Sequence, residues 1–178
     1  GNHRLGQDDV VRALAVPHRV GVSSWATQIV CDVHNGGRGS YVVHYTPEAV
    51  GEFTLYVTLN GHLDILHRRA LSHEIHGSPF QVSVSDGAPS GTVSIARGPG
   101  LGLGGTVAGV AGVPSVFTVQ VKDAAGNNRS VAGDRVAAVL SGPARVECAV
   151  QYLSGSSGGV YELSYLPLVS GVYTLRVS

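Results

Sequence analysis

A long internal repeat limits what this chain can fold into. The stretch 39–61 (GSYVVHYTPEAVGEFTLYVTLNG) recurs near the other end of the chain as 159–177 (GVYELSYLPLVSGVYTLRV). In each copy an alternating apolar run reaches a proline, and a second alternating run begins after a glycine, which is the pattern of strand, turn and strand. The matched residues are each 120 positions apart: Tyr45 and Tyr165, Pro47 and Pro167, Gly51 and Gly171, Phe53 and Tyr173. The repeat therefore predicts two similar domains.

Composition limits the class of each domain. The 178 residues suffice for two domains of about 90 residues each. The chain has 25 Gly and 8 Pro among Val-, Tyr- and Thr-rich runs, which predicts an all-β fold of short strands joined by turns. Lys and Arg together number 12, as do Asp and Glu, so no broad field favours nucleic acid or an anionic membrane. No apolar run is long enough for membrane insertion. The predicted partners are proteins.

The two cysteines, Cys31 and Cys148, occupy corresponding places in the two copies. Because they belong to different predicted domains, a disulfide between them is not expected, and neither domain has a cysteine pair of its own. We interpret both as buried free thiols, which favours a reducing compartment.

A second offset indicates the domain boundaries. Residues 1–15 match residues 126–140, 125 positions later. The second copy also has strand candidates at 92–97 and 115–123, for which the first copy offers no counterpart. We therefore expect domain 1–86 to lack its first two strands and domain 87–178 to lack its last. The sequence is then a window of a longer array, with 86–91 (DGAPSG) as the linker.

Three further strands are expected in the first domain, at 9–16, 25–33 and 78–85. Residues 61–77 form an insertion between two of its strands. Within the insertion, four apolar side chains could line one face of a short helix: Leu63, Leu66, Ala70 and Leu71.

Five sequence segments, in this order, resemble the filamin-type immunoglobulin-like repeat: 98–101 (GPGL), 122–126 (KDAAG), 161–167, 171–177 and, from the first copy, 77–80 (GSPF). The resemblance implies tandem seven-stranded β-sandwiches that act as a scaffold or spacer and dock partner peptides at exposed strand edges. The insertion 61–77 is longer than the connection usual in that family. No calponin-type actin-binding segment is present, so actin crosslinking does not follow.

In the resembling family a ligand strand adds beside the third strand and lies against the fourth. Those strands correspond here to 134–140 and 145–151. The expected docking edge consists of Arg135, Ala137, Val139, Val146, Cys148 and Val150, the last three being either core or the floor of the groove. The first copy offers a secondary edge at Arg12 and Leu14, where the charge disfavours pairing, so the second edge is expected to be the better site. In the alternative, neighbouring domains cover both edges.

Motifs for chemistry are weak in this chain. Gly100, Gly102 and Gly105 match a dinucleotide fingerprint, but a strand rather than a helix is expected next, so no cofactor is predicted. The histidines of the insertion lack the spacing of a metalloprotease helix, so no metal is predicted; they are His62, His67, His73 and His76. Asn128 begins a glycosylation sequon, which we interpret as chance. No catalytic set can be assembled, and an enzyme is not expected.

Two functional hypotheses remain. The first is a structural and docking module of a large intracellular protein. Of the 12 basic residues one is lysine, a bias common in GC-rich genomes such as those of green algae. Filamin-like repeats occur in the tails of some algal outer-arm dynein heavy chains, so a resemblance to a ciliary motor tail or cytoskeletal scaffold is included. The second is an extracellular adhesion protein with filamin repeats, as on gametes.

Overall fold

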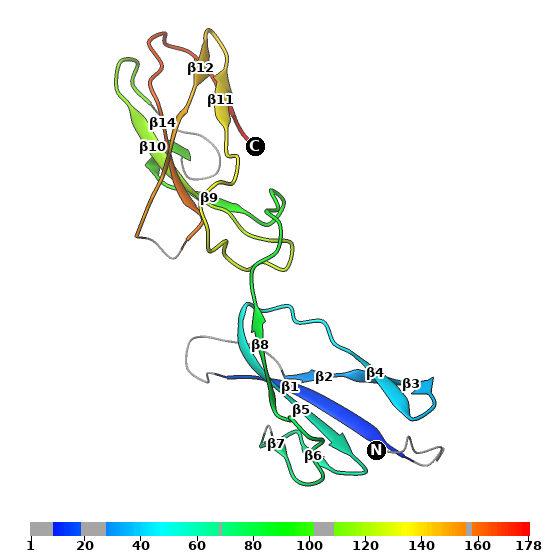
Figure 1. Ribbon diagram of the computed structural model, residues 1–178. Coiled ribbons are helices and arrows are strands. Elements are labelled where there is room, and N and C mark those ends of the chain that lie inside the picture. Colours follow the sequence, from blue (N-terminus) through cyan, green and yellow to red (C-terminus); the bar gives the residue numbers. More distant parts are fainter. Residues whose placement is uncertain (1–8, 19–27, 68, 102–108, 156–157) are drawn as a thin grey trace. The chain divides into compact units, whose positions relative to one another are not determined.

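The computed structural model describes residues 9–18, 28–67, 69–101, 109–155 and 158–178 (Figure 1). By its contacts the chain divides into two compact units, Gly1–Ser85 (unit 1) and Asp86–Ser178 (unit 2). The described part of both units is built from β-strands, and its one helical segment is a short 3-10 turn, η1 (Pro99–Leu101). The fold is thus all-β, as the sequence predicts.

Unit 1 contains a four-stranded antiparallel sheet. The strand order is β2-β1-β5-β8, with β1 at Val11–Pro17, β2 at Ile29–Val30, β5 at Gly51–Leu59 and β8 at Phe80–Val84. Alternate residues of β1 and β5 face one core, so that Ala13 and Ala15 pack with Phe53 and Val57. The strand predicted at 25–33 is broken near Cys31, and its residues 25–27 lie outside the described part.

Unit 1 also contains a hairpin outside this sheet. It pairs β3 (Asp32–Gly37) with β4 (Ser40–His44). Cys31 still donates its N–H to the carbonyl of Ala13 in β1, at 3.2 Å, before the chain leaves that sheet to form β3. One expected strand is therefore two, because its halves pair in different sheets.

The prediction of a helix in the insertion is wrong. Residues 61–77 instead contain a second hairpin, β6 (Leu63–Asp64) with β7 (Arg69–Ala70). The carboxylate of Asp64 accepts the backbone N–H of His67 at 2.9 Å, which closes a turn where a helix would have continued. Leu66 is 90% exposed at this turn, so the apolar residues do not form one buried helical face.

Unit 2 has two sheets around one core, a β-sandwich. One sheet has the order β13-β14-β10-β9, with β9 at Ile95–Arg97, β10 at Ser115–Gln120, β13 at Ala149–Tyr152 and β14 at Val160–Tyr165. The other has the order β12-β11-β15, with β11 at Ala138–Ser141, β12 at Arg145–Glu147 and β15 at Thr174–Val177. Alternate side chains of β10, β11 and β14 meet in the core, among them Phe117, Leu140 and Leu163.

Several strand pairings of the two units coincide residue by residue. Leu14 pairs with Tyr56 in unit 1, and Val139 pairs with Arg176 in unit 2. Val139 is the equivalent of Leu14, 125 positions later, and Arg176 is the equivalent of Tyr56, 120 positions later. Cys148 donates its N–H to Ala138 at 3.0 Å, as Cys31 does to Ala13. In both units the strand then crosses to another pairing partner. The sequence repeat thus corresponds to one repeated arrangement of strands.

We expect Leu163→Ala to destabilise unit 2 by about 2–5 kcal/mol, because it removes a side chain with 0% exposure from the core and leaves a cavity. Leu168→Ala, at a position 74% exposed, should cost less than about 0.5 kcal/mol. Urea unfolding followed through the NMR amide signals of β10 and β14 measures both. Equal losses for the two variants would contradict the assigned core.

Candidate docking edge

The third strand of unit 2, β11, is not open along its whole length. Val139 pairs with Glu147 of β12 on one side and with Arg176 of β15 on the other. The expectation that Val139 lies at an open edge is therefore wrong, because the first half of the fourth strand pairs there. A partner strand cannot add beside β11 itself.

The edge opens just before β11, at residues 134–137. Ala137 exchanges two backbone hydrogen bonds with Ser178, at 2.7 and 2.8 Å, on the side of β15. Consecutive residues of an extended strand direct their N–H and C=O groups to opposite edges, so Val136 directs its own away from β15. Within the described residues no backbone group pairs with Val136. The open edge is thus centred on this residue.

Side chains around this edge alternate as the sequence predicts. Ala138 and Leu140 are buried and Val136 is half-buried, whereas Arg135 and Ala137 are exposed. The core side chains hold the segment against the sandwich and leave its outer face to solvent.

The fourth strand supplies a possible floor for a docked strand. Val146 and Cys148 are half-buried and pack on the core. Val150 pairs with Leu163, whose exposure is 0%, so the two side chains lie on the same, inner face of the sheet. Val150 is nevertheless 40% exposed. The inner face of β13 is therefore exposed to solvent at Val150. From the sequence alone, this residue could have belonged either to the core or to the floor of the groove.

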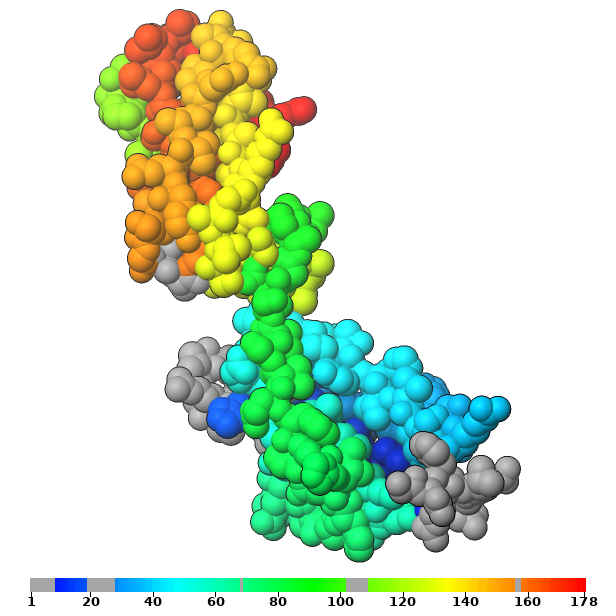
Figure 2. Space-filling view, in the orientation of Figure 1, coloured from blue at the N-terminus to red at the C-terminus, as the bar shows by residue number. Residues whose placement is uncertain are grey.

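Third- and fourth-strand residues lie side by side on one surface. In Figure 2 the visible face of unit 2 carries the yellow residues that lead into β11 next to the orange residues of β12 and β13. The segment that leads into β11 thus lies beside β12 and β13 on this face, and Val139 and Val146 lie where β11 and β12 pair.

Polar contacts fix the start of the open edge. The Tyr161 hydroxyl accepts the N–H groups of Gly133 and Asp134, at 3.1 and 3.0 Å. The guanidinium of Arg129 donates to the Asp134 carboxylate at 3.1 Å. The hydrogen bond to Asp134 is the main cause that raises the pKa of Arg129. These contacts hold the edge in one position before any partner arrives.

Both cysteines are free thiols, as expected. Cys31 is buried and Cys148 is half-buried, and burial raises the pKa of each thiol. Because the thiolate is the reactive form, neither environment favours nucleophilic or redox chemistry.

The prediction of a secondary docking edge in unit 1 is wrong at Leu14. This residue has 0% exposure, and its strand edge is occupied by Val30 of β2. Arg12 is exposed, and its guanidinium donates to the carbonyl of Gly61 at 2.7 Å. The alternating pattern placed both side chains on the outer face but could not show that this face is covered at Leu14.

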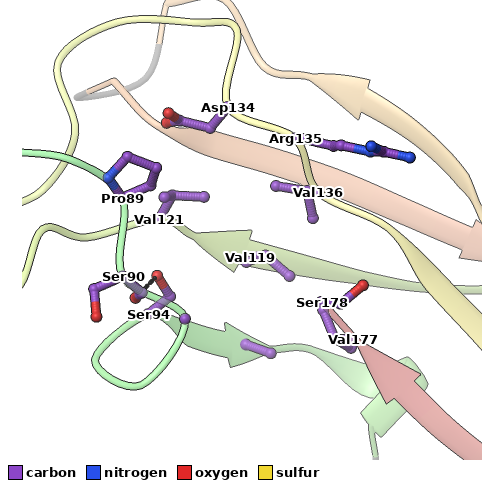
Figure 3. A pocket seen from close by; sticks show the side chains of 12 residues that line it. Pro89, Ser90, Ser94, Val119, Val121, Asp134, Arg135, Val136, Val177 and Ser178 are labelled. Carbon is purple, nitrogen blue, oxygen red and sulfur yellow. Dashed lines mark hydrogen bonds between the residues drawn. The ribbon is translucent and has the colours of Figure 1, made fainter.

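Unit 2 also contains a cavity of about 290 Å³ (Figure 3). It lies between β9 and β10 of one sheet and, from the other sheet, the end of β15 and residues 134–136. The lining is apolar at Val119, Val121 and Val136, with serines at the rim. In unit 1, β8 pairs with β5, the equivalent of β15, so that Val82 lies opposite Phe53 and Phe80 opposite Leu55.

We expect a synthetic peptide of residues 78–84 (SPFQVSV) to pair with β15 of unit 2 in the register that β8 makes with β5 in unit 1. In that register Phe80 of the peptide lies opposite Leu175, whose backbone groups point away from β11. Calorimetry should show a higher melting temperature of unit 2 with the peptide than with a scrambled peptide of equal composition. An identical melting temperature with both peptides would show that β15 does not select this strand.

Other motifs have structural roles or fall outside the described residues. Gly100 lies in η1, where an added Cβ would stand 2.8 Å from the carbonyl oxygen of Val116. Gly102 and Gly105 are outside the described part. Among the residues with assigned positions, no group of three His, Cys, Asp or Glu side chains could hold a metal ion. In the same part of the chain no helix is long and apolar enough to cross a membrane.

The segment 86–91 is not a free linker. Ser90 donates its N–H to Lys122 at 2.7 Å, and Gly87 donates its N–H to Asp123 at 2.9 Å. Asp123 is 4% exposed and also accepts the N–H of Asn127 at 2.8 Å. Burial acts to raise the pKa of Asp123, but hydrogen bonds from Gly87 and Asn127 outweigh it, and the pKa is lowered.

We expect the stability of unit 2 to decrease in acid partly through Asp123. A carboxylate whose pKa is lower in the folded state stabilises the fold above its unfolded pKa, about 3.9, and this contribution is lost as pH falls through the folded pKa. Asp123→Asn should lower the melting temperature at pH 7 and flatten its decrease below about pH 4. Calorimetry between pH 7 and pH 2 measures this. Parallel curves for the two proteins would contradict the assignment.

The geometry defines the class of protein as an all-β immunoglobulin-like sandwich with an open strand edge. A solved structure of FdeC, an Escherichia coli adhesin, has the same kind of fold, with a TM-score of 0.55 and 20% identity over 99% of this chain and 50% of that one. At this identity the likeness concerns the fold alone.

The family model of the Filamin/ABP280 repeat matches residues 88–178, and the chain belongs to this family. Rat filamin-C is 29% identical over 146 residues, which is 82% of this chain and 4% of that protein. Drosophila melanogaster filamin-A is 31% identical over 139 residues, 78% of this chain and 5% of that protein. The chain thus spans about one twentieth of the length of these relatives. Such repeats are non-enzymatic modules of structure and protein interaction.

Proposed function

We propose that this chain is a scaffold and docking module that binds an extended segment of a partner protein at residues 134–137 of unit 2. The observation that carries the proposal is Val150, an inner-face side chain that is 40% exposed beside an open strand edge. A partner strand beside Val136 would satisfy the unpaired backbone groups and cover Val150.

The edge also defines the chemistry of the partner. Side chains that point inward from the added strand meet Val150, so they should be aliphatic or small. Side chains that point outward lie beside Arg135, which favours an acidic residue there. The best partner segment is therefore extended, with alternating apolar and acidic residues.

Selection from a displayed library of 12-residue peptides tests this proposal. We expect enriched peptides to show that alternation and to slow hydrogen exchange at the Val136 amide. Val150→Glu should weaken their binding at least tenfold, because it places a charge under the docked strand. This corresponds to a loss of binding free energy of about 1.4 kcal/mol or more. The matched control is Gln151→Glu on the neighbouring outward-facing residue. Equal binding by both variants would contradict the site.

We further propose that unit 1 is a second repeat of the same family, spanning about 1–86, and that unit 2 provides the better docking edge. The support is the coincidence of strand pairings in the two units. In unit 1 the equivalent of Val150 is Val33, 117 positions earlier, which is half-buried against the core. A docked strand would gain less apolar contact there.

For the parent protein we propose an intracellular scaffold, cytoskeletal or ciliary, for example the tail of an outer-arm dynein heavy chain of a green alga. The two free thiols and the arginine-rich composition support this placement. An extracellular adhesion protein is the alternative. Asn128 is exposed in unit 2, so mass spectrometry of the native protein distinguishes them: an unmodified Asn128 is expected, and an attached glycan would favour the alternative.

A further inference from the structure

One arginine joins two segments of unit 2 that are distant in sequence. The guanidinium of Arg129 donates through Nε and Nη2 to the Asp134 carboxylate, at 3.2 and 3.1 Å. Through Nη1 it donates to the Asp86 carboxylate and, at 2.6 Å, to the carbonyl of Gly87. The side chains are 14% exposed for Arg129, 5% for Asp86 and 7% for Asp134. Few water molecules therefore compete for this cluster.

The first of these segments is the chain that follows β8. The carboxylate of Asp86 accepts the hydroxyl of Ser130 and its N–H, the latter at 3.2 Å. The hydrogen bond from the Ser130 hydroxyl is the main cause that lowers the pKa of Asp86. Together with the bond from Gly87 to Asp123, these contacts attach residues 86–90 to the loop 122–134.

The second segment is the proposed docking edge, whose first residue is Asp134. Because a guanidinium is planar and its donors have fixed directions, Arg129 cannot turn toward one carboxylate without changing its geometry at the other. If Asp86 is released, Arg129 loses the partner on one side of the fork, and the position of Asp134 is less restricted.

We propose that Arg129 is a positioning residue that couples the attachment of residues 86–90 to the docking edge at 134–137. The edge is held in the geometry that accepts a partner strand while Asp86 is bound, and release of Asp86 loosens it. A partner bound at the edge strengthens the hold on Asp86 in return, because coupling between two sites is reciprocal. This regulation rests on the proposed docking function.

The test changes Asp86 and measures the edge. In Asp86→Asn, we expect hydrogen exchange at Asp134 and Ala137, whose N–H groups are hydrogen-bonded, to become at least tenfold faster, while exchange in β10 and β14 stays unchanged. The matched control is Glu147→Gln, which removes the carboxylate of the exposed Arg145–Glu147 pair in the same unit. Unchanged exchange at Asp134 and Ala137 in Asp86→Asn would overturn the proposal.

A milder variant covers the case in which Asp86→Asn does not fold. Ser130→Ala removes only the hydroxyl that donates to Asp86. It should accelerate exchange at the edge in the same direction, and unchanged exchange would again overturn the coupling.

Peptide affinity separates the coupling from the docking function. Peptides selected on the native chain should bind Asp86→Asn about tenfold more weakly and Glu147→Gln with native affinity. If the native chain selects no peptide, the docking function fails while the exchange experiment still decides the coupling. If peptides bind Asp86→Asn with native affinity, the docking function stands and the coupling fails.

Discussion

One strand pairing, β11 with β15 in unit 2 and β1 with β5 in unit 1, determines where the remaining strands of each unit lie. In unit 2 β11 pairs with β15, and in unit 1 β1 pairs with β5, with equivalent residues opposite each other. Since side chains alternate between faces, this register decides which of them enter the core: Ala15 and Leu55 in unit 1, Leu140 and Leu175 at the same places in unit 2. A slip by one residue would turn every one of them to the opposite face of its sheet. The same register leaves the fourth strand to pair with the other edge of the third.

The crossing of the fourth strand between two partners produces the docking edge. Its first part pairs with β11, and after Cys148 it joins β14 in the other sheet. The crossing uncovers the third strand upstream of Ala138 and the inner face of β13 at Val150. In unit 1 the strand crosses at the equivalent Cys31, but Val33 packs on the core. The two units therefore share these strand pairings and differ in what the crossing exposes.

The sequence predicted what depends on local alternation and could not predict what depends on distant partners. The faces of Val136, Ala138 and Leu140 followed from period two. The crossing at Cys148 has no local signal, because Val146, Cys148 and Val150 alternate without interruption through it. The prediction of a helix near Leu63 and Leu66 was wrong. The spacing of the apolar residues matched one face of a helix, but the Asp64 side chain accepts a backbone N–H and closes a turn there. The carboxylates on Arg129 are 43 and 5 residues away, so no spacing rule joins them.

The short length of the open edge determines how such a site can recognise a partner. Val136 is the residue whose backbone groups point to that edge, because Ala137 is bonded to Ser178. A docked strand thus gains about two backbone hydrogen bonds, each contributing roughly 0.5–1.5 kcal/mol. Affinity must then depend on side chains over Val150 and on how little the edge has to be ordered upon binding. The Tyr161 hydroxyl and Arg129 restrict the edge beforehand, so for a site this small the contacts behind the strand matter as much as those in front of it.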